Sequence, residues 1–522
     1  MYPARARWSG CFLLGLLLAG CGGGGGGGNS PAPPAWTAGV FEPSSNFDAM
    51  CAVPRTGTDP TTNQPFPDAQ ATTAHENHWL RSWTNELYLW YAEVLDQNPA
   101  LFTTPAYFDL MMTSATTPSG NPKDQFHFTF PTADWVALSQ SGAQAGYGAA
   151  WIILEATPPR RLVVGFTEPG SPATTAPANL VRGVEVLFVD GVDLVNDDTP
   201  AGVDTLNAGL FPSVASQAHT FTVRDPGGAQ RTFSMTSIIV TSDPVQNVSV
   251  IPTATGPVGY LLFNDHIATA EQELIDAVNF LQGQMVTDLV LDIRYNGGGF
   301  LDIASEFAYM IAGAGQTAGQ TFELLQFSDK HPMRDPVTGD LLAPIPFHQT
   351  SQGFSGPANQ ALPALNLGRV FVLTGPDTCS ASESIMNSLR GVDVEVIQIG
   401  STTCGKPYGF YPFDNCGTTY FSIQFKGVNA KNFGDYADGF SPQNTLTNAG
   451  ERIPGCSVRD DYTRQLGDQA EERLAEALRY RTGGSCTVAP SGLARATLAE
   501  APEVTDGRMY KSPWHQNRIL RR

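Results

Sequence analysis

Lysine is scarce in this chain of 522 residues, and positive charge is in the minority. Lys and Arg together number 30 against 50 Asp and Glu, which gives a formal net charge of −20. Binding to a phosphate backbone needs clustered cationic side chains, so we expect no nucleic-acid partner. The excess of negative charge otherwise concerns solubility and does not indicate a substrate.

Long hydrophobic runs are missing after the N-terminus, and the run at the N-terminus is too short to cross a bilayer. Residues 1–20 combine two arginines, an apolar run and small residues, which is the pattern of a secretory signal peptide. The stretch L-A-G-C at 18–21 resembles the lipobox of bacterial lipoproteins, which implies acylation of Cys21. A plain cleaved signal with a coincidental cysteine is the alternative.

The residues after the predicted lipid attachment point favour an anchored protein. Residues 21–45 contain seven consecutive glycines and a proline-rich stretch, which predict a flexible tether. We therefore expect an exported protein that meets the membrane through its N-terminal lipid. Gly22, rather than Asp, follows Cys21. By resemblance to lipoprotein sorting rules, this favours the periplasmic side of the outer membrane in a bacterial cell envelope.

C-x-x-C pairs are absent, so a zinc site is the weaker interpretation, and we expect no metal and no cofactor. Removal of the signal peptide and lipidation of Cys21 leave six cysteines, an even number that predicts disulfides in an exported protein. Six cysteines allow 15 connectivities. The short loop 404–416 suggests the pair Cys404–Cys416, and a pair Cys456–Cys486 would tie down a C-terminal helix.

Three regions with different patterns follow the tether. In residues 46–137, aromatic and apolar side chains recur at helical spacing, which predicts an N-terminal helical cap. His75 and His78 could share a helix face as metal ligands, but H-E-x-x-H is absent, so a solvated helix start is the preferred interpretation. The side chains with helical spacing are Trp79, Trp83, Leu87, Trp90 and Tyr91.

Residues 138–245 consist of short β-rich runs separated by Gly, Pro and Asp turns. The order of the runs resembles a PDZ domain, with Gly146, Tyr147, Gly148 and Ala149 in the place of its carboxylate-binding loop. This resemblance implies that backbone N–H groups capture the C-terminus of a polypeptide, which adds a strand to the sheet. An ordinary small β domain that packs against its neighbour is the alternative.

In residues 246–486, predicted strands alternate with amphipathic helices, which indicates an α/β fold with a mainly parallel sheet. Three of the predicted strands run into loops of unusual composition, Y-N-G-G-G-F, D-T-C-S-A-S and S-T-T-C-G-K-P-Y-G. Functional loops lie at the carboxyl ends of parallel strands, so we expect these three loops to meet. Residues 487–522 have no apolar periodicity and are predicted to be a loosely held tail.

Ser380 lies in the second loop, where a predicted strand meets a predicted helix. Taken alone, Ser380-x-x-Glu383 is a capping box, whose hydroxyl and carboxylate bond to free N–H groups at the helix start. The alternative is a nucleophile, because such N–H groups, including that of Ala381, stabilise a developing oxyanion. The G-x-S-x-G motif is absent, and no histidine lies in a motif that marks a triad.

Lys406, in the third loop, is the one lysine that follows a predicted buried strand into small residues. An isolated loop lysine is usually a surface residue. A free lysine has a pKa of about 10.4, and this pKa must fall by about 3, on the order of 4 kcal/mol, before the amine can act as a base at neutral pH. Tyr408 and Phe410 would help to provide the dry surroundings.

Taken together, the loops resemble the C-terminal-processing (tail-specific) serine peptidase family, whose recurrent segments are D-L-R-N-N-P-G-G, S-A-S-E and T-F-G-K-G. The matching stretches here are L-D-I-R-Y-N-G-G-G, T-C-S-A-S-E-S-I and T-T-C-G-K-P. The resemblance extends from about residue 75 to 482 and implies a crotonase-like ββα peptidase core. It also implies Ser380 as nucleophile, Lys406 as general base, and the N–H groups of Gly298 and Ala381 as oxyanion hole.

Three positions depart from the family pattern. Gly297 replaces a proline, Cys404 replaces an aromatic residue, and Phe410 stands where many members have a glutamine that orients the lysine. Asn415 or Gln424 would then have to orient the amine, or the site is weakened.

The sequence therefore predicts an envelope serine endopeptidase with a Ser/Lys dyad. Its substrates are polypeptides whose free C-termini are captured by the PDZ-like domain. Two alternatives stay open: a catalytically weak or inactive scaffold that binds protein tails, and a hydrolase of another ester or amide. The sequence carries no signal of oligomeric state.

Overall fold

The computed structural model describes residues 32–60, 62–446, 450–487 and 517–519. The predicted signal peptide, the lipid attachment at Cys21 and the first part of the tether lie outside these residues. Within the described ranges, no helix combines the length and the apolar character needed to cross a membrane.

A six-stranded sheet forms the centre of the molecule, in the order β12-β13-β14-β18-β19-β26. The pair β12–β13 is antiparallel, and the other four pairs are parallel. The predicted parallel α/β sheet is therefore present in this part of the chain. The strands are β12 (Val245–Ile251), β13 (Val258–Phe263), β14 (Asp288–Asp292), β18 (Arg369–Thr374), β19 (Glu395–Gly400) and β26 (Gly455–Ser457).

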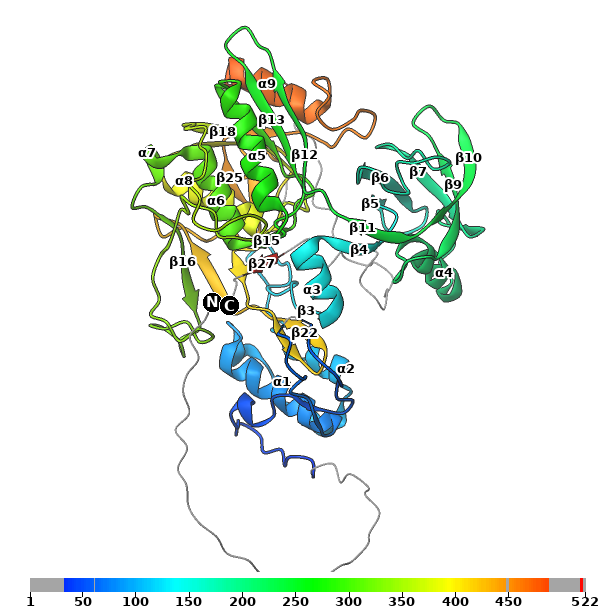
Figure 1. The fold of residues 1–522 in the computed structure, drawn as a ribbon, viewed down its shortest axis with the longest axis vertical. Coiled ribbons are helices and arrows are strands. Elements are labelled where there is room, and N and C mark those ends of the chain that lie inside the picture. The colour runs from blue at the N-terminus through cyan, green and yellow to red at the C-terminus, as the bar shows by residue number, and fades with distance from the viewer. Residues whose placement is uncertain (1–31, 61, 447–449, 488–516, 520–522) are drawn as a thin grey trace, which may run out of the picture.

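Helices cover both faces of the central sheet (Figure 1). Successive strand residues point to opposite faces. Leu261 and Phe263 of β13 accordingly pack with α5, α6 and α8, whereas Tyr260 and Leu262 pack with α9. These helices are α5 (Ala270–Gly283), α6 (Leu301–Ala312), α8 (Ala381–Gly391) and α9 (Glu472–Gly483), and the short α7 (Ala314–Thr317) follows α6.

Smaller sheets surround the central one, and most of their pairings are antiparallel. One has the order β17-β16-β23-β20, and another the order β21-β22-β3. The structure as a whole is thus mixed α/β. A mainly parallel sheet is not confirmed beyond the central sheet, and the crotonase-like description stays a prediction. The strands are β3 (Phe128–Pro131), β16 (Thr321–Phe327), β17 (Ile345–Pro346), β20 (Tyr408–Gly409), β21 (Phe413–Asn415), β22 (Thr418–Phe421), β23 (Phe425–Val428), β24 (Phe440–Pro442) and β25 (Glu451–Ile453).

Residues 143–241, here called the β lobe, lie to one side of the central sheet (Figure 1). Their antiparallel sheet has the order β10-β9-β7-β6-β5, with β8 added to β7, and β4 pairs with β11 where the chain enters and leaves. β5 pairs with β6 alone among the described strands, so it is an edge strand. The elements are β4 (Ala143–Gly146), β5 (Ala149–Glu155), β6 (Arg161–Thr167), β7 (Glu185–Val189), β8 (Val192–Asp193), α4 (Pro200–Leu210), β9 (Ala218–Arg224), β10 (Gln230–Thr236) and β11 (Ile238–Thr241).

The N-terminal region is built on α1 (Thr73–Leu87), as the helical spacing predicts. Trp79 and Trp83 stack on each other, and both lie against Tyr420 of β22. His75 and His78 are buried, so the prediction of a solvated helix start is wrong. The other elements are η1 (Ser44–Asn46), β1 (Met50–Cys51), β2 (Ala69–Gln70), η2 (Tyr91–Glu93), η3 (Pro99–Leu101), α2 (Thr104–Phe108) and α3 (Thr132–Ser141).

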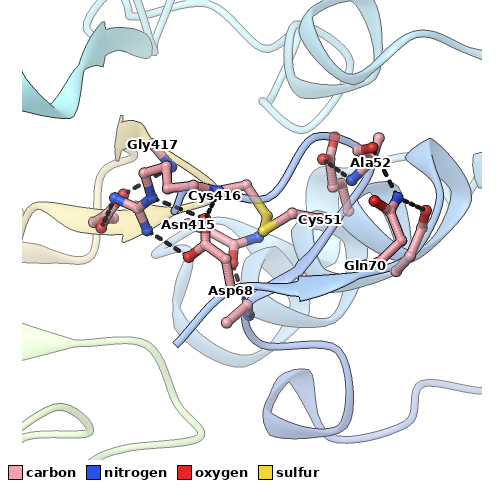
Figure 2. Close-up of a disulfide and its surroundings, with 12 residues drawn as sticks. Cys51, Ala52, Asp68, Gln70, Asn415, Cys416 and Gly417 are labelled. Carbon is pink, nitrogen blue, oxygen red and sulfur yellow. Dashed lines mark hydrogen bonds and ion pairs between the residues drawn. A yellow bond between two sulfur atoms is a disulfide. The ribbon is translucent and has the colours of Figure 1, made fainter. Parts of the chain in front are cut away.

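Three disulfides occur within the described residues. Cys51–Cys416 ties the N-terminal region to the turn between β21 and β22 (Figure 2). Cys456–Cys486 joins β26 to the chain after α9, which confirms that predicted pair. The predicted pair Cys404–Cys416 is wrong, because Cys404 bonds instead to Cys379 of the serine loop. The short distance along the chain between Cys404 and Cys416 did not predict their partners, since the fold brings Cys51, 365 residues away, next to Cys416.

Candidate active site

Ser380 lies directly before α8, in the tight connection that leads from β18 into this helix. Its backbone has φ 57° and ψ −113°, a conformation that is rare for residues other than glycine. A strained strand-to-helix turn of this kind presents a nucleophilic serine in hydrolases with a G-x-S-x-G motif. The same local geometry therefore occurs here without that motif.

The hydroxyl of Ser380 is buried, and its Oγ has no hydrogen-bond partner among the described residues. Leaving a buried polar group without a partner costs about 1–3 kcal/mol. Such a group calls for a physical explanation, and a catalytic role is one of them.

Lys406 follows β19 in the third loop and is fully buried. Its Nζ lies 4.8 Å from the ring centre of Phe126 and 4.5 Å from that of Phe410. Phe410, which replaces the expected glutamine, thus belongs to the wall around the amine. The amine of Lys406 is thus buried beside two aromatic rings.

Glu383 connects the serine turn to the lysine loop. Its Oε2 accepts hydrogen bonds from Ser380 N at 2.9 Å and from Lys406 N at 2.8 Å, and its Oε1 accepts from Gly405 N at 2.9 Å and Thr403 Oγ1 at 2.5 Å. Burial raises the pKa of Glu383, while these hydrogen bonds lower it. The S-x-x-E spacing predicted only a helix cap by Glu383. Its hydrogen bonds to the lysine loop join residues 20 or more positions apart, and no motif in the sequence predicted them.

A covalent bond joins the same two loops. Cys379, next to Ser380, forms a disulfide with Cys404, and their Cα atoms are 5.2 Å apart. Cys404, which replaces an aromatic residue of the family pattern, therefore restrains the lysine loop against the serine turn.

The glycine loop also contacts the serine turn. The carbonyl oxygen of Asn296 accepts from Cys379 N at 3.1 Å and from Ser382 Oγ at 3.0 Å. All three unusual loops thus meet at the carboxyl ends of β14, β18 and β19, which are neighbours in the central sheet. The predicted meeting of the loops is confirmed.

The two predicted oxyanion donors, Gly298 N and Ala381 N, differ in their hydrogen bonding in this structure. Gly298 N donates to Asn296 Oδ1 at 2.9 Å, so it is engaged within its own loop. Asn296 Oδ1 also lies 2.9 Å from Nδ1 of His266, whose pKa burial lowers to about 3. Ala381 N belongs to the first turn of α8, where N–H groups have no partner within the helix.

A second position of this loop, Gly299, must be glycine because there is no room for a side chain. At Gly299, with φ 136°, an added Cβ would lie 2.5 Å from the carbonyl oxygen of His266. The loop therefore follows the backbone of His266 at a distance that no other residue permits.

Asn415 and Gln424, the predicted replacements for the orienting glutamine, form other hydrogen bonds. Asn415 Oδ1 accepts from Ala49 N at 3.0 Å, and Gln424 Oε1 accepts from Tyr411 N at 3.0 Å. The aromatic rings of Phe126 and Phe410 lie beside the Lys406 amine.

The predicted carboxylate-binding loop, from Gly146 to Ala149, connects β4 to β5 in the β lobe. Tyr147 is buried, and its hydroxyl donates to the carbonyl oxygen of Gly209 at 3.1 Å. Gly148 has φ 75°, and an added Cβ there would overlap the side chain of Ser171. The loop is thus packed against the lobe at the start of its edge strand.

Two groups of potential metal ligands occur among the described residues. One contains Cys379, Glu383 and Cys404, and the other contains Cys456 and Cys486 with Glu476. In both groups the cysteines form a disulfide, so their sulfurs are not available as thiolate ligands.

Comparison with known proteins identifies a family for the central part of the chain. Residues 257–411, which include all three loops, match the model of Peptidase family S41. The Carboxyl-terminal-processing protease of Picosynechococcus sp. is 32% identical over 142 residues, which are 27% of this chain and 32% of that protein. The match therefore spans about a third of this curated relative.

A solved structure supports the fold. A crystal structure from Bacteroides fragilis NCTC 9343, assigned to the S41 proteases, covers 78% of this chain and 97% of its own, with a TM-score of 0.57 and 23% identity. At this identity the likeness concerns the mixed α/β fold. The family resemblance predicted from the three loops is confirmed.

Proposed function

Because the chain carries a peptidase family S41 domain at residues 257–411, we propose that it is a serine endopeptidase with a Ser380/Lys406 dyad. This proposal rests on the combination of a strained, buried serine without a hydroxyl partner and a buried lysine whose amine lies beside two aromatic rings. Glu383 and the Cys379–Cys404 disulfide hold the two loops together.

In the proposed reaction, neutral Lys406 takes the proton from Ser380 Oγ as this oxygen attacks a peptide carbonyl. The protonated amine then gives this proton to the leaving amine, and an acyl-enzyme forms. Water, activated by Lys406, releases the second product and restores the serine. The oxyanion would accept from Ala381 N, and from Gly298 N once this group leaves Asn296 Oδ1.

We further propose that the β lobe captures the C-terminus of the substrate. The loop 146–149 precedes β5, and one edge of β5 is unpaired among the described strands, which supports addition of a peptide strand there. Polypeptides with a free C-terminus are the expected partners. Export and lipid anchoring at Cys21 belong to this proposal and stand on the N-terminal sequence.

Substitution of either dyad residue tests the proposal. Ser380→Ala and Lys406→Ala are expected to reduce cleavage of an unfolded protein substrate by at least about 10³-fold, as for other covalent mechanisms. Ser388→Ala, on the same helix, and Lys431→Ala, on the surface, are matched controls that should retain wild-type rates. Circular dichroism and thermal unfolding check that each variant folds. Substantial cleavage by folded Ser380→Ala would contradict the dyad.

A binding scaffold with weak or no catalysis is the second candidate. The engagement of Gly298 N by Asn296 Oδ1 favours it, since an oxyanion hole needs this donor free. A wild-type chain that binds unfolded protein but cleaves it no faster than folded Ser380→Ala would establish the scaffold.

A further inference from the structure

A short strand near the C-terminal end of the chain lies against the glycine loop. β27 (Asn517–Ile519) pairs in parallel with β15 (Gly298–Phe300), in the register Gly298↔Asn517, Gly299↔Arg518 and Phe300↔Ile519. Figure 1 shows the two strands side by side near the middle of the molecule. The sequence predicted only a loosely held tail here, so this pairing is new information.

The other edge of β15 is already occupied. His266 N donates to the carbonyl oxygen of Gly298 at 3.1 Å, and Phe300 N donates to the carbonyl oxygen of His266 at 2.9 Å. A strand has two edges for main-chain pairing. β27 therefore takes the edge that remains available to an added chain.

This edge lies near the elements that follow the other two loops of the site. β27 also lies beside α8, which begins immediately after Ser380, and beside β20, which begins two residues after Lys406. Its neighbours thus include the glycine loop itself and the elements that directly follow the serine and lysine loops. A polypeptide that presents a peptide bond to Ser380 must enter the same space.

The burial of the dyad agrees with an occupied groove. Ser380 and Lys406 are both fully buried with the chain in this arrangement. A polypeptide substrate cannot contact either group until something moves. Release of β27 would expose the edge of β15 that it covers, and it would leave the central sheet intact, because β15 and β27 form a separate sheet.

Charge and connectivity favour the chain's own tail as occupant. Residues 507–522 contain five Lys and Arg and no Asp or Glu, whereas the whole chain has a net charge of −20. A basic segment is attracted to an acidic body. Because the segment is covalently attached, its effective concentration at the groove is on the order of millimolar.

We propose that substrate polypeptides add as a parallel strand to the edge of β15 that β27 occupies in this structure. The chain's own C-terminal strand is then the ligand that fills this edge when no substrate is bound. The tail is then a tethered competitor that lowers the rate of substrate entry. This inference rests on the proposed function, which makes β15 part of a peptidase site. Main-chain pairing explains how one groove accepts both the tail and substrates of other sequences.

Proline substitution in the full-length chain tests the pairing. Proline lacks the N–H that a strand donates, and successive N–H groups point to opposite sides, so Arg518→Pro/Ile519→Pro removes whichever donor faces β15. We expect kcat/KM for an unfolded protein substrate to rise at least about fivefold, as a millimolar tethered competitor is released. The matched control Arg518→Ala/Ile519→Ala keeps every main-chain donor and should stay near wild type.

A binding measurement separates this inference from the peptidase proposal. A fluorescent peptide with the sequence of residues 511–522 is titrated into full-length Ser380→Ala chains that carry either substitution pair. The proline-pair chain should bind it at least about tenfold more tightly, because its groove is vacated. A peptide with prolines at the positions of 518 and 519 should not bind.

The outcomes are distinct. Equal kcat/KM in wild-type, proline-pair and alanine-pair chains, without peptide binding, would overturn the strand assignment and leave the peptidase intact. Equal activation by both pairs would overturn main-chain addition. Peptide binding to the proline-pair chain when no chain cleaves substrate would support the strand assignment while the peptidase proposal fails.

Discussion

At the residue scale, the site depends on how a few buried polar groups are satisfied. Glu383 serves four donors from two loops, whereas the hydroxyl of Ser380 has no partner among the described residues. The sequence predicted Ser380 and Lys406 from their loops. It could not predict Glu383 as the link between them, because that role depends on atoms brought together only by the folded sheet.

Glu306 offers a residue-scale test of pH dependence. Burial and the nearby Glu271 raise the pKa of Glu306 from 4.5 to about 9, and Gln352 N donates to both side chains. The unfolded chain loses this proton near pH 4.5 while the folded chain keeps it, so Glu306 makes the free energy of unfolding fall as pH rises from about 4.5 to 9. Glu306→Gln should flatten this fall, as measured by urea unfolding at pH 5 and pH 8. An unchanged pH dependence would show that Glu306 is ionised in the folded chain.

At the element scale, strand alternation and helical spacing predicted most elements of the core. Strands β13, β14, β18 and β19 alternate with helices α5, α6 and α8, in agreement with the alternation predicted for residues 246–486. The small antiparallel sheets around them were missed, because all of their strands except β16 have only two to four residues, which is too short a pattern to recognise. The error at His75 and His78 has a similar origin, since only tertiary packing covers the start of α1.

Two disulfides of similar loop length allow an element-scale test. Cys379–Cys404 spans 25 residues and joins the serine and lysine loops, whereas Cys456–Cys486 spans 30 residues and joins β26 to the chain after α9. Loop entropy predicts similar stabilisation by each, about 3–4 kcal/mol. We expect paired alanine substitutions to lower Tm similarly, while only Cys379→Ala/Cys404→Ala lowers kcat/KM, by about 10²-fold through misplaced loops. Activity should be measured at a temperature well below the Tm of both disulfide variants, so that unfolding does not contribute to the loss of activity. Equal activities would show that the first disulfide only stabilises.

At the scale of the whole molecule, a buried charge network joins the β lobe to the core. Arg182 of the lobe lies 2.6 Å from Asp460 Oδ1 and donates to the hydroxyl of Tyr295 at 2.6 Å. Arg294 of the core also contacts Asp460, at 2.5 Å. The nearby guanidinium groups hold the pKa of Asp460 well below its usual range, against the effect of burial. The lobe is thus fixed by specific polar contacts as well as by apolar packing.

Arg182→Met should weaken this attachment. Removing one partner of a buried ion pair costs about 3–5 kcal/mol, and Arg294 remains to compensate Asp460, so we expect a loss near the lower end. Limited proteolysis in residues 241–245, where the chain passes from lobe to core, should become faster. Arg224→Met, at an exposed ion pair within the lobe, is the control. Unchanged proteolysis and Tm would indicate that apolar packing alone holds the lobe.

The sequence by itself determined the central α/β order, the three strand-end loops and their resemblance to a peptidase family, because these follow from local periodicity and short motifs. Only the tertiary structure decided which cysteines pair, what surrounds Lys406, that Gly298 donates to Asn296, and that the C-terminal strand lies on β15. Each of these features depends either on contact between segments that are distant along the chain or on the direction in which a side chain points. Such contacts depend on how the sheets pack in space, and the linear pattern of residues does not encode them locally.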